Sequence, residues 1–289
     1  MSDRSSPRYE RLVFAVRAFS KYGTPNRLAQ AVEDCGWEQI RAQLGSDSPG
    51  PHVEPLYAMG VDVVFRGGDC YPLQLNHLRR PPGLLFTWGN RDLLRATSVS
   101  MCGSRHVSER GLEAAAACGL EVATCGLTIV SGYASGVDTA THLAALRSGG
   151  STVIVLAEGI LGFRKKRVFH DVPFDEEHVV VVSQFAPGQH WNVGAAMTRN
   201  GVIVSLGKAL VVIEAGETGG TLNAGLQALE LGRAVLALEF SSQPTPAGNQ
   251  LLIEKGAVPI QTRQQLGRVV KSIQEMRTKR PALEQLRLA

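Results

Sequence analysis

The chain has 289 residues, 44% of them hydrophobic, and a formal net charge of +4. This length suffices for one large domain and a small accessory domain. No apolar stretch is long enough to cross a bilayer, and the first residues lack the apolar core of a secretion signal, so we expect a cytoplasmic protein.

The basic excess lies mainly in the segment from residue 260 onward, whereas residues 51–259 are slightly acidic. A polyanion site in the middle of the chain therefore has to be a local patch. The five cysteines form no CxxC pair, which favours free thiols in a reducing compartment. No spacing of His, Cys and Asp suits a metal ion, and we expect neither a metal nor a cofactor.

Residues 1–50 form the first predicted unit, a small helical domain. Leu12, Val16 and Phe19 have helical spacing, and a turn-rich linker begins at Gly45. Such a unit fits a helix-hairpin-helix-like or sterile-alpha-motif-like module, but it also fits a simple structural cap.

Residues 56–262 form the main predicted domain. Apolar, β-branched runs occur at 61–65, 98–102, 127–131, 152–157, 179–183, 210–214 and 234–238. Helix-like segments between them include 109–124, 138–148 and 221–231. This alternation predicts an α/β fold with a mostly parallel sheet and helices on both faces. A basic helical tail, residues 263–289, is expected to follow.

The first candidate site is the turn Gly103-Ser104-Arg105, directly after the predicted strand at 98–102. Glycine lets backbone amides approach a ligand, serine adds a hydroxyl, and arginine offers a fork for phosphate oxygens. Ligands of open α/β sheets bind where strand carboxyl ends meet helix starts. The alternative is a tight turn with a solvated arginine.

A second turn of the same kind begins at Ser131-Gly132, and its helix carries Asp138 and, one turn later, His142. The two side chains could orient a ligand. They could equally be a helix-start acid and a satisfied interior histidine.

A third strand ends near Glu214, and Gly219-Gly220-Thr221 opens the next helix. These residues can present consecutive amides to an anion. No lysine follows the glycines and nothing resembles GxGxxG, which disfavours ATP hydrolysis and a dinucleotide cofactor.

Two basic features complete the pattern, namely Arg164-Lys165-Lys166-Arg167 and Arg199-Asn200. The four-residue run is either solvated surface or a track for a strand of phosphates. Trp191 and Phe163 could stack on bases, although aromatic residues are more often core. No Ser–His–Asp or Cys–His arrangement is found, so a binding protein is favoured over an enzyme.

In this order the motifs resemble the DprA/Smf family of DNA-processing proteins. The resemblance spans about residues 60–260. It rests on Tyr71-Pro72, Pro81-Pro82 before Gly89-Asn90, Gly103-Ser104-Arg105, Val130-Ser131-Gly132 through Asp138 and His142, Val212–Ala215 with Gly220–Ala224, and Gly248-Asn249 with Gly256-Ala257.

The resemblance implies an extended Rossmann-like domain that binds single-stranded DNA without sequence preference. It also implies a homodimer that protects incoming strands and loads a RecA-type recombinase during natural transformation. The family's DNA contacts map to Arg105 and Arg199-Asn200, with amides near Gly103 and Gly132 holding a phosphate. Asp138, His142, Glu214 and Asn249 then support the site.

The chain departs from the family pattern at several points. The usual RNR motif is reduced to Arg199-Asn200-Gly201, and the usual SE-P-G reads Ser183-Gln184 through Pro187-Gly188. The basic run Arg164–Arg167 stands where a second tyrosine-proline motif is usual and is a candidate replacement for the missing arginine. We expect no winged-helix domain after Gln261.

Two other functions stay open at this point. The wider superfamily includes nucleotide sensors that use the same crevice, some of them in anti-phage signalling. It also includes lysine-decarboxylase-like enzymes that cleave nucleotide riboside phosphates, but the position of their catalytic glutamate is Ala224 here.

Overall fold

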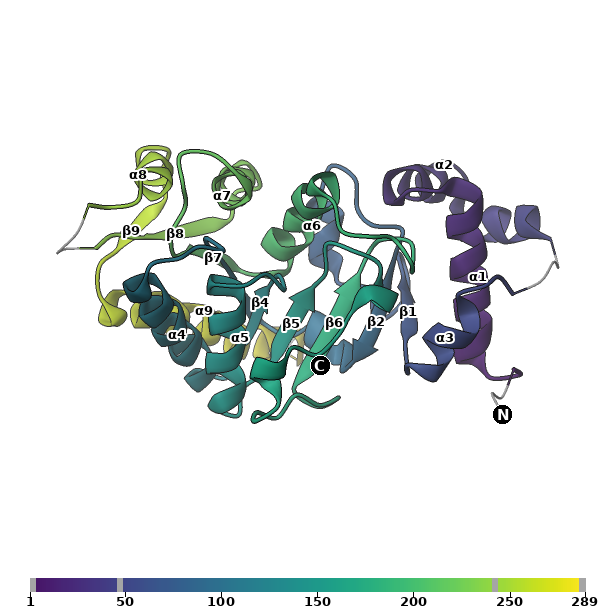
Figure 1. The fold of residues 1–289 in the computed structure, drawn as a ribbon, viewed down its shortest axis with the longest axis horizontal. Helices are drawn as coiled ribbons and strands as arrows, with labels where there is room; N and C mark the ends of the chain where they lie inside the picture. The colour runs from purple at the N-terminus through teal and green to yellow at the C-terminus, as the bar shows by residue number, and fades with distance from the viewer. Residues whose placement is uncertain (1–3, 46–48, 241–243, 286–289) are drawn as a thin grey trace.

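The computed structural model describes residues 4–45, 49–240 and 244–285, with side chains to residue 276. Its centre is a sheet in the order β1-β2-β6-β5-β4-β3-β7-β8-β9 (Figure 1). The strands are β1 (Asp62–Phe65), β2 (Leu84–Gly89), β3 (Ser98–Cys102), β4 (Thr128–Ser131), β5 (Thr152–Val155), β6 (Val179–Ser183), β7 (Ala209–Val212), β8 (Ala234–Leu238) and β9 (Val258–Ile260).

The sheet is parallel from β6 to β9, and β1 and β2 add an antiparallel edge. The predicted mostly parallel α/β arrangement is confirmed. β2 and β9 were not among the predicted strands. β9 has only three residues, one of them Pro259, which explains why it was missed. β2 was missed although Phe86, Thr87 and Trp88 favour a strand.

Helices cover both faces of the parallel part. One face carries α4 (Glu109–Thr124), α5 (Val137–Arg147) and α9 (Arg263–Gln285), and the other carries α6 (Val193–Leu206), α7 (Gly220–Glu230) and α8 (Ala247–Glu254) (Figure 1). The strands read as continuous apolar runs because successive residues face opposite layers. In β4, for example, Ile129 joins the α4–α5 core and Val130 the α6 core.

The N-terminal helices α1 (Pro7–Tyr22), α2 (Pro25–Leu44) and α3 (Val53–Ala58) lie beside the β1 edge (Figure 1). Ser6 and Thr24 cap α1 and α2 ahead of a first-turn proline, which is a common helix start. Leu12 and Phe19 of α1 share a core with Val63 and Phe86 of the sheet. The predicted domain limits themselves stay predictions.

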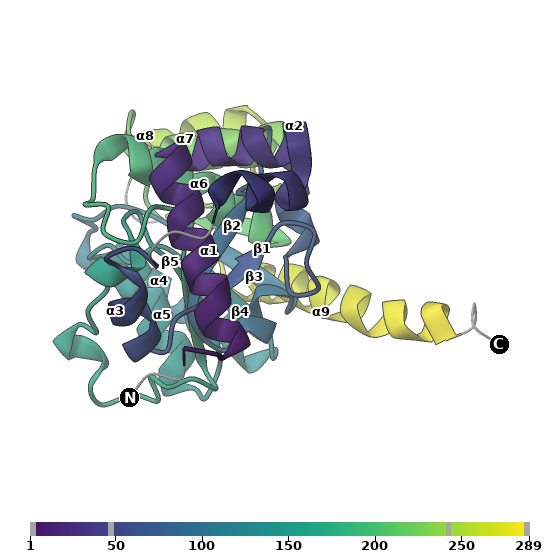
Figure 2. The same cartoon turned by 90° about the vertical axis from the view of Figure 1, so that its right-hand side faces the viewer.

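The C-terminal helix α9 packs on α4 through its first turns and then extends away from the body (Figure 2). The predicted tail is therefore helical to Gln285, and residues 286–289 lie outside the described residues. Short 3-10 turns fill loops at η1 (Leu73–His77), η2 (Arg91–Leu94), η3 (Ile160–Gly162) and η4 (Arg167–Phe169).

Within the described ranges, no helix has both the length and the apolar character that a bilayer crossing needs. The five cysteines are free thiols, and Cys102 and Cys118 are buried.

Candidate functional site

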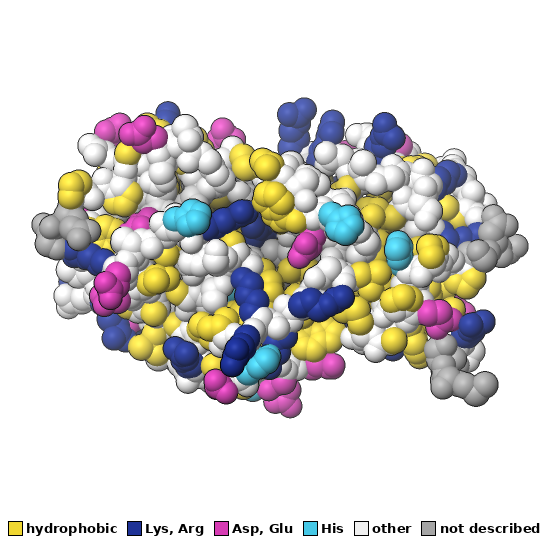
Figure 3. Space-filling view, in the orientation of Figure 1, with side chains coloured by type: hydrophobic (Ala, Val, Ile, Leu, Met, Phe, Trp, Pro, Cys, Tyr) yellow, Lys and Arg dark blue, Asp and Glu magenta, His cyan; other side chains and the backbone are white. Residues whose placement is uncertain are grey.

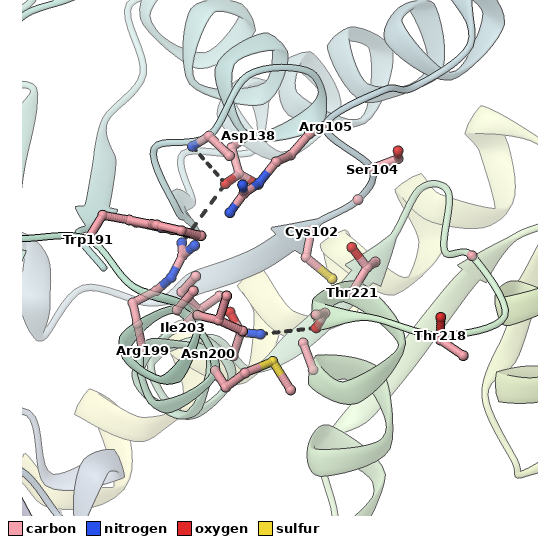
Figure 4. A pocket seen from close by; sticks show the side chains of 18 residues that line it. Cys102, Ser104, Arg105, Asp138, Trp191, Arg199, Asn200, Ile203, Thr218 and Thr221 are labelled. Atoms are coloured by element: carbon pink, nitrogen blue, oxygen red, sulfur yellow. Dashed lines mark hydrogen bonds and ion pairs between the residues drawn. The ribbon is translucent and has the colours of Figure 1, made fainter. Parts of the chain in front are cut away.

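A cavity of about 440 Å³ lies at the carboxyl ends of β3, β4 and β7, between α5, α6 and α7 (Figure 4). All three predicted turns reach it. Its lining includes Gly103, Ser104, Arg105, Asp138, Arg199, Asn200, Gly220 and Thr221. We call the Gly103–Arg105 turn, the Gly132–Asp138 turn and Arg199 the cradle.

The turn after β4 has space only for glycine at position 132. A Cβ added to Gly132 would lie 1.6 Å from Arg199 Nη1 and 2.4 Å from Asp138 Oδ2. Gly136 has a φ of 75° and packs against the Ser104 carbonyl, where a Cβ would lie at 2.5 Å. The Gly103–Arg105 turn and the Gly132–Asp138 turn therefore pack directly against each other, and the second turn also packs against Arg199.

Asp138 holds this turn together from the first turn of α5. Its Oδ2 accepts the Ala134 N–H at 3.1 Å and lies 3.9 Å from Arg199 Nη1, and its Oδ1 lies 3.0 Å from Ser131 Oγ. The Ser131 hydroxyl is also 2.7 Å from the Met101 carbonyl, which ties β4 to β3. The carboxylate is thus paired within the protein, and the charged side chains that remain to meet a ligand in the cavity are the arginines.

His142 supports the same turn from below and is fully buried. Its Nε2 donates to the Gly132 carbonyl at 2.6 Å, which leaves Nδ1 to accept from Thr152 Oγ1 at 2.6 Å. Burial lowers the pKa of His142 to about 4, so the ring is neutral at physiological pH. Asp138 and His142 thus make only internal contacts.

Arg199 is the buried cation of the cradle, with an 8% exposed side chain. Nη1 donates to the Val155 carbonyl at 3.3 Å, and Nε has no partner among the described residues. Burial lowers the pKa of Arg199, Asp138 opposes that shift, and the nearby Arg105 adds to it. The guanidinium still keeps its charge, and it is left with an unfilled donor beside a second cation.

Arg105 reaches into the cavity from the opposite wall (Figure 4). Its guanidinium carbon lies 5.1 Å from the ring centroid of Trp191, a side chain that is 46% exposed. An arginine that rests on an aromatic face keeps its donors free for a ligand at the edge. Trp191 therefore positions the guanidinium of Arg105, and part of its own ring stays exposed to solvent.

The third turn is joined to the cradle by Asn200, whose Nδ2 donates to the Gly220 carbonyl at 3.0 Å. Gly219 has a φ of 108° and ends the loop, and α7 starts at Gly220 with Thr221 in its first turn. The start of α7 therefore faces the cavity from the side opposite α5.

Glu214 and Asn249 brace the loops behind the cavity. Glu214 Oε2 accepts the Ser108 N–H at 3.0 Å, and its Oε1 accepts the Ser108 hydroxyl at the start of α4. Asn249 donates to the carbonyls of Ile213 at 2.9 Å and Leu238 at 2.7 Å, and accepts the Ala215 N–H at 2.8 Å. Both residues fix loop positions and do not line the cavity.

The basic run Arg164–Arg167 lies beside the cradle and does not line the cavity. Lys166 Nζ donates to the Tyr133 carbonyl at 2.7 Å and to Thr139 Oγ1 at 3.2 Å, and burial lowers its pKa. Arg164 Nη1 donates to the carbonyls of Leu161 and Phe163 at 2.9 and 2.7 Å.

The two aromatic residues of the sequence prediction have different surroundings. Phe163 packs among Trp88, Tyr133 and Phe174, with ring centroids 5.4–6.2 Å away, whereas Trp191 stands at the cavity mouth. The sequence did not distinguish them. Ile160 and Leu161 before Phe163 could have favoured burial, although the basic run follows it directly, and the polar neighbours of Trp191 could have favoured exposure.

The arrangement is that of an anion site. Two guanidinium groups and two helix starts converge on one cavity, and its one lining carboxylate, Asp138, is already engaged. In the described part of the chain, no group of three His, Cys, Asp or Glu residues is placed to hold a metal ion.

Comparison with known proteins gives consistent matches. The family described as DNA recombination-mediator protein A matches residues 62–271. The DNA processing protein DprA of Streptococcus pneumoniae is 36% identical over 192 residues, 65% of this chain and 67% of that protein. DprA of Bacillus subtilis is 29% identical over 73% of this chain and 72% of that protein. Protein Smf of Escherichia coli is 33% identical over 66% of this chain and 51% of that protein.

Two solved structures share the fold. The crystal structure of S. pneumoniae DprA matches with a TM-score of 0.67 at 27% identity, over 91% of this chain and 96% of that one. DprA of Helicobacter pylori, whose structure is described as giving insight into a single-stranded DNA binding mode, matches with a TM-score of 0.63 at 22% identity. That match covers 73% of this chain and 96% of the other.

Proposed function

Since this chain belongs to the DNA recombination-mediator protein A family, we propose that it binds single-stranded DNA without sequence preference and mediates recombination. The cradle is the phosphate site. Arg105 and Arg199 contact the phosphate oxygens, and the amides near Gly103, Gly132 and the Gly219–Thr221 turn add neutral donors.

One observation carries this proposal: a buried arginine with an unpartnered Nε faces the same cavity as a second, exposed arginine. A buried donor without a partner costs about 1–3 kcal/mol, and more for a charged group, so a site of this kind is completed by an anion. The partly exposed ring of Trp191 adds a surface for a base next to the phosphate.

The test is a titration of labelled oligothymidine and mixed-sequence single strands, followed by fluorescence anisotropy at several salt concentrations. We expect similar affinities for all sequences. The logarithm of the binding constant should fall with that of the salt concentration by about 0.7 per neutralised phosphate. Absence of any affinity at low salt would contradict the proposal.

The finer steps are part of the same proposal. The protein acts in the cytoplasm as a homodimer, protects incoming strands and hands them to a RecA-type recombinase, and it does so by binding and not by catalysis. Light scattering tests the dimer. Filament assembly by the recombinase on coated single strands, with and without the protein, tests the hand-over.

A nucleotide-sensing role is the second candidate, because a cavity of about 440 Å³ lies within the usual range of about 300–1,000 Å³ for small-ligand sites. Calorimetry with linear and cyclic nucleotides separates the two functions. A nucleotide that binds more tightly than any oligonucleotide would favour sensing.

A further inference from the structure

A second polar cavity, of about 280 Å³, lies on the opposite side of α6 from the cradle. Residues of α6, α7, α2, the loop before β2 and the end of β6 line it, and no acidic side chain is among them. The lining residues are Asn26, Leu78, Arg79, Arg80, Gln184, Met197, Thr198, Gly201 and Gln227.

Arg79 and Arg80 supply the positive charge of this cavity. Both are exposed, and among the described residues neither forms a salt bridge. Pro81 and Pro82 follow directly and restrict the backbone of the loop. Figure 3 shows Lys and Arg side chains projecting from the top of the molecule in the region between α6 and α2.

Gln184 supplies a buried donor. It follows β6, is 5% exposed and lines the cavity, and its Nε2 has no hydrogen-bond partner in the described part of the chain. Buried amide groups are nearly always paired, so an unpaired one beside two arginines points to an acceptor that comes from outside the protein. An anionic oxygen is the acceptor that suits all three groups.

The two cavities lie on either side of α6 and share one lining residue. Met197 borders both, while Arg199 and Asn200 face the cradle and Thr198 and Gly201 face the second cavity. Only the width of one helix, about 10–12 Å with its side chains, separates them. A flexible chain of phosphates that leaves the cradle can therefore reach Arg79 and Arg80 over the first turns of α6.

We propose that Arg79, Arg80 and Gln184 form a second phosphate subsite, which holds the same DNA strand after it has crossed α6. This inference rests on the proposed function of the cradle. It adds the direction of the strand, from the cradle over α6 toward the N-terminal helices.

The test compares oligothymidines of about 4 and about 16 nucleotides, the range of site sizes in single-strand-binding grooves. The full chain is used as wild type, as Arg79→Ala/Arg80→Ala, and as Gln184→Glu, which places a negative charge in the cavity. Arg95→Ala/Arg147→Ala is the matched control, because it removes two exposed arginines that line neither cavity.

For the long oligonucleotide we expect the Arg79→Ala/Arg80→Ala variant to lose about tenfold in affinity and about 1.4 from the salt slope, two contacts at about 0.7 each. Gln184→Glu should also weaken binding of the long strand. The short oligonucleotide should bind all variants within about twofold of wild type, because the cradle suffices for it.

Other outcomes overturn the inference. The Arg79→Ala/Arg80→Ala variant and the matched control could lose the same affinity, or the variant could lose the same affinity for both oligonucleotide lengths. Either result means that only the net charge of the protein matters. If Arg105→Ala abolishes binding while the substitutions at Arg79, Arg80 and Gln184 change nothing, the second subsite is wrong and the proposed role of the cradle is retained. If the wild type binds neither length, both proposals fail together.

Discussion

The cradle and the basic run Arg164–Arg167 carry similar charge but differ in what that charge contacts. In the cradle, arginines from two distant segments converge on one cavity, and Arg199 keeps an unfilled donor. In the run, Arg164 and Lys166 already donate to backbone carbonyls, and Lys165 Nζ lies 5.3 Å from the Phe174 ring centroid.

The difference separates charge density along the sequence from the convergence of charge in the fold. In the run of four consecutive cations, Arg164 and Lys166 use their donors on nearby groups of the protein. Two cations 94 positions apart meet because Arg105 follows the end of β3 and Arg199 lies in the first half of α6, which begins at the same edge of the sheet. Substitutions in the cradle and in the basic run test whether DNA binding depends on convergence of charge or on charge density along the sequence.

The largest effect is expected from Gly132→Ala, which puts a methyl group into the space of Arg199 Nη1. Overpacking of this kind costs about 1–3 kcal/mol, and here it also displaces the cation, so DNA binding should be lost. Thermal unfolding and anisotropy measure the two effects. Gly162→Ala, beside the basic run and with its closest added contact at 3.3 Å, is the control and should change neither.

Lowering the pH should reduce the stability of the folded protein, because His142 beneath the cradle is buried as a neutral ring. The folded-state pKa of about 4 lies below the ordinary value of 6.5, so the unfolded state binds the proton first. The stabilisation of the folded state by the neutral His142 ring is therefore complete above pH 6.5. It is lost as the pH falls toward 4, and the total loss in the free energy of unfolding is on the order of 3 kcal/mol.

Denaturant unfolding between pH 4 and 8 checks this expectation. The stability difference between wild type and His142→Gln should shrink as the pH falls. His170→Gln, at an exposed position after the basic run, is the comparison and should follow the wild-type curve. A constant difference between wild type and His142→Gln would contradict the buried neutral ring.

Arg105→Ala tests convergence against density directly. A hydrogen bond to a charged group contributes about 1.5–3 kcal/mol, so DNA affinity should fall between about tenfold and a hundredfold. Arg164→Ala/Arg167→Ala removes twice the charge but should cost about threefold or less. The reverse order of losses would make the basic run the principal contact.

The smallest effect is expected at Trp191. Trp191→Ala removes a stacking surface worth about 1–3 kcal/mol per base and frees Arg105 from its ring, whereas Trp191→Phe keeps an aromatic face. Anisotropy with oligothymidine should show a loss for the alanine variant that phenylalanine largely restores. Equal losses in both variants would exclude stacking.

Much of the fold could be predicted from the sequence because its strands are buried on both faces. Val179–Val182, for example, are all valine, and a parallel sheet between two helical layers buries both faces of such a run. β9 could not be predicted, because three residues with a central proline form a strand only through pairing with β8. The composition of β2 favours a strand, and that strand was overlooked.

From the sequence alone, the three turns of the candidate site could be placed near one another. Each turn follows a strand, and the carboxyl ends of parallel strands lie at the same edge of the sheet. Burial could not be predicted. Arg199 and Lys166 are both basic residues of motifs that were predicted to bind phosphate, yet packing leaves Nε of Arg199 without a partner and gives Nζ of Lys166 two acceptors.

The open Nε of Arg199 has a consequence for how this protein can evolve. Under the proposed function, the free protein keeps an unpaired donor that its ligand pairs. An apolar residue at 199 would not make the protein more stable, because it would leave the buried Asp138 carboxylate without its cation. Stability could be gained here only by replacing Arg199 and Asp138 together with apolar residues, and that change would also remove the proposed phosphate contact.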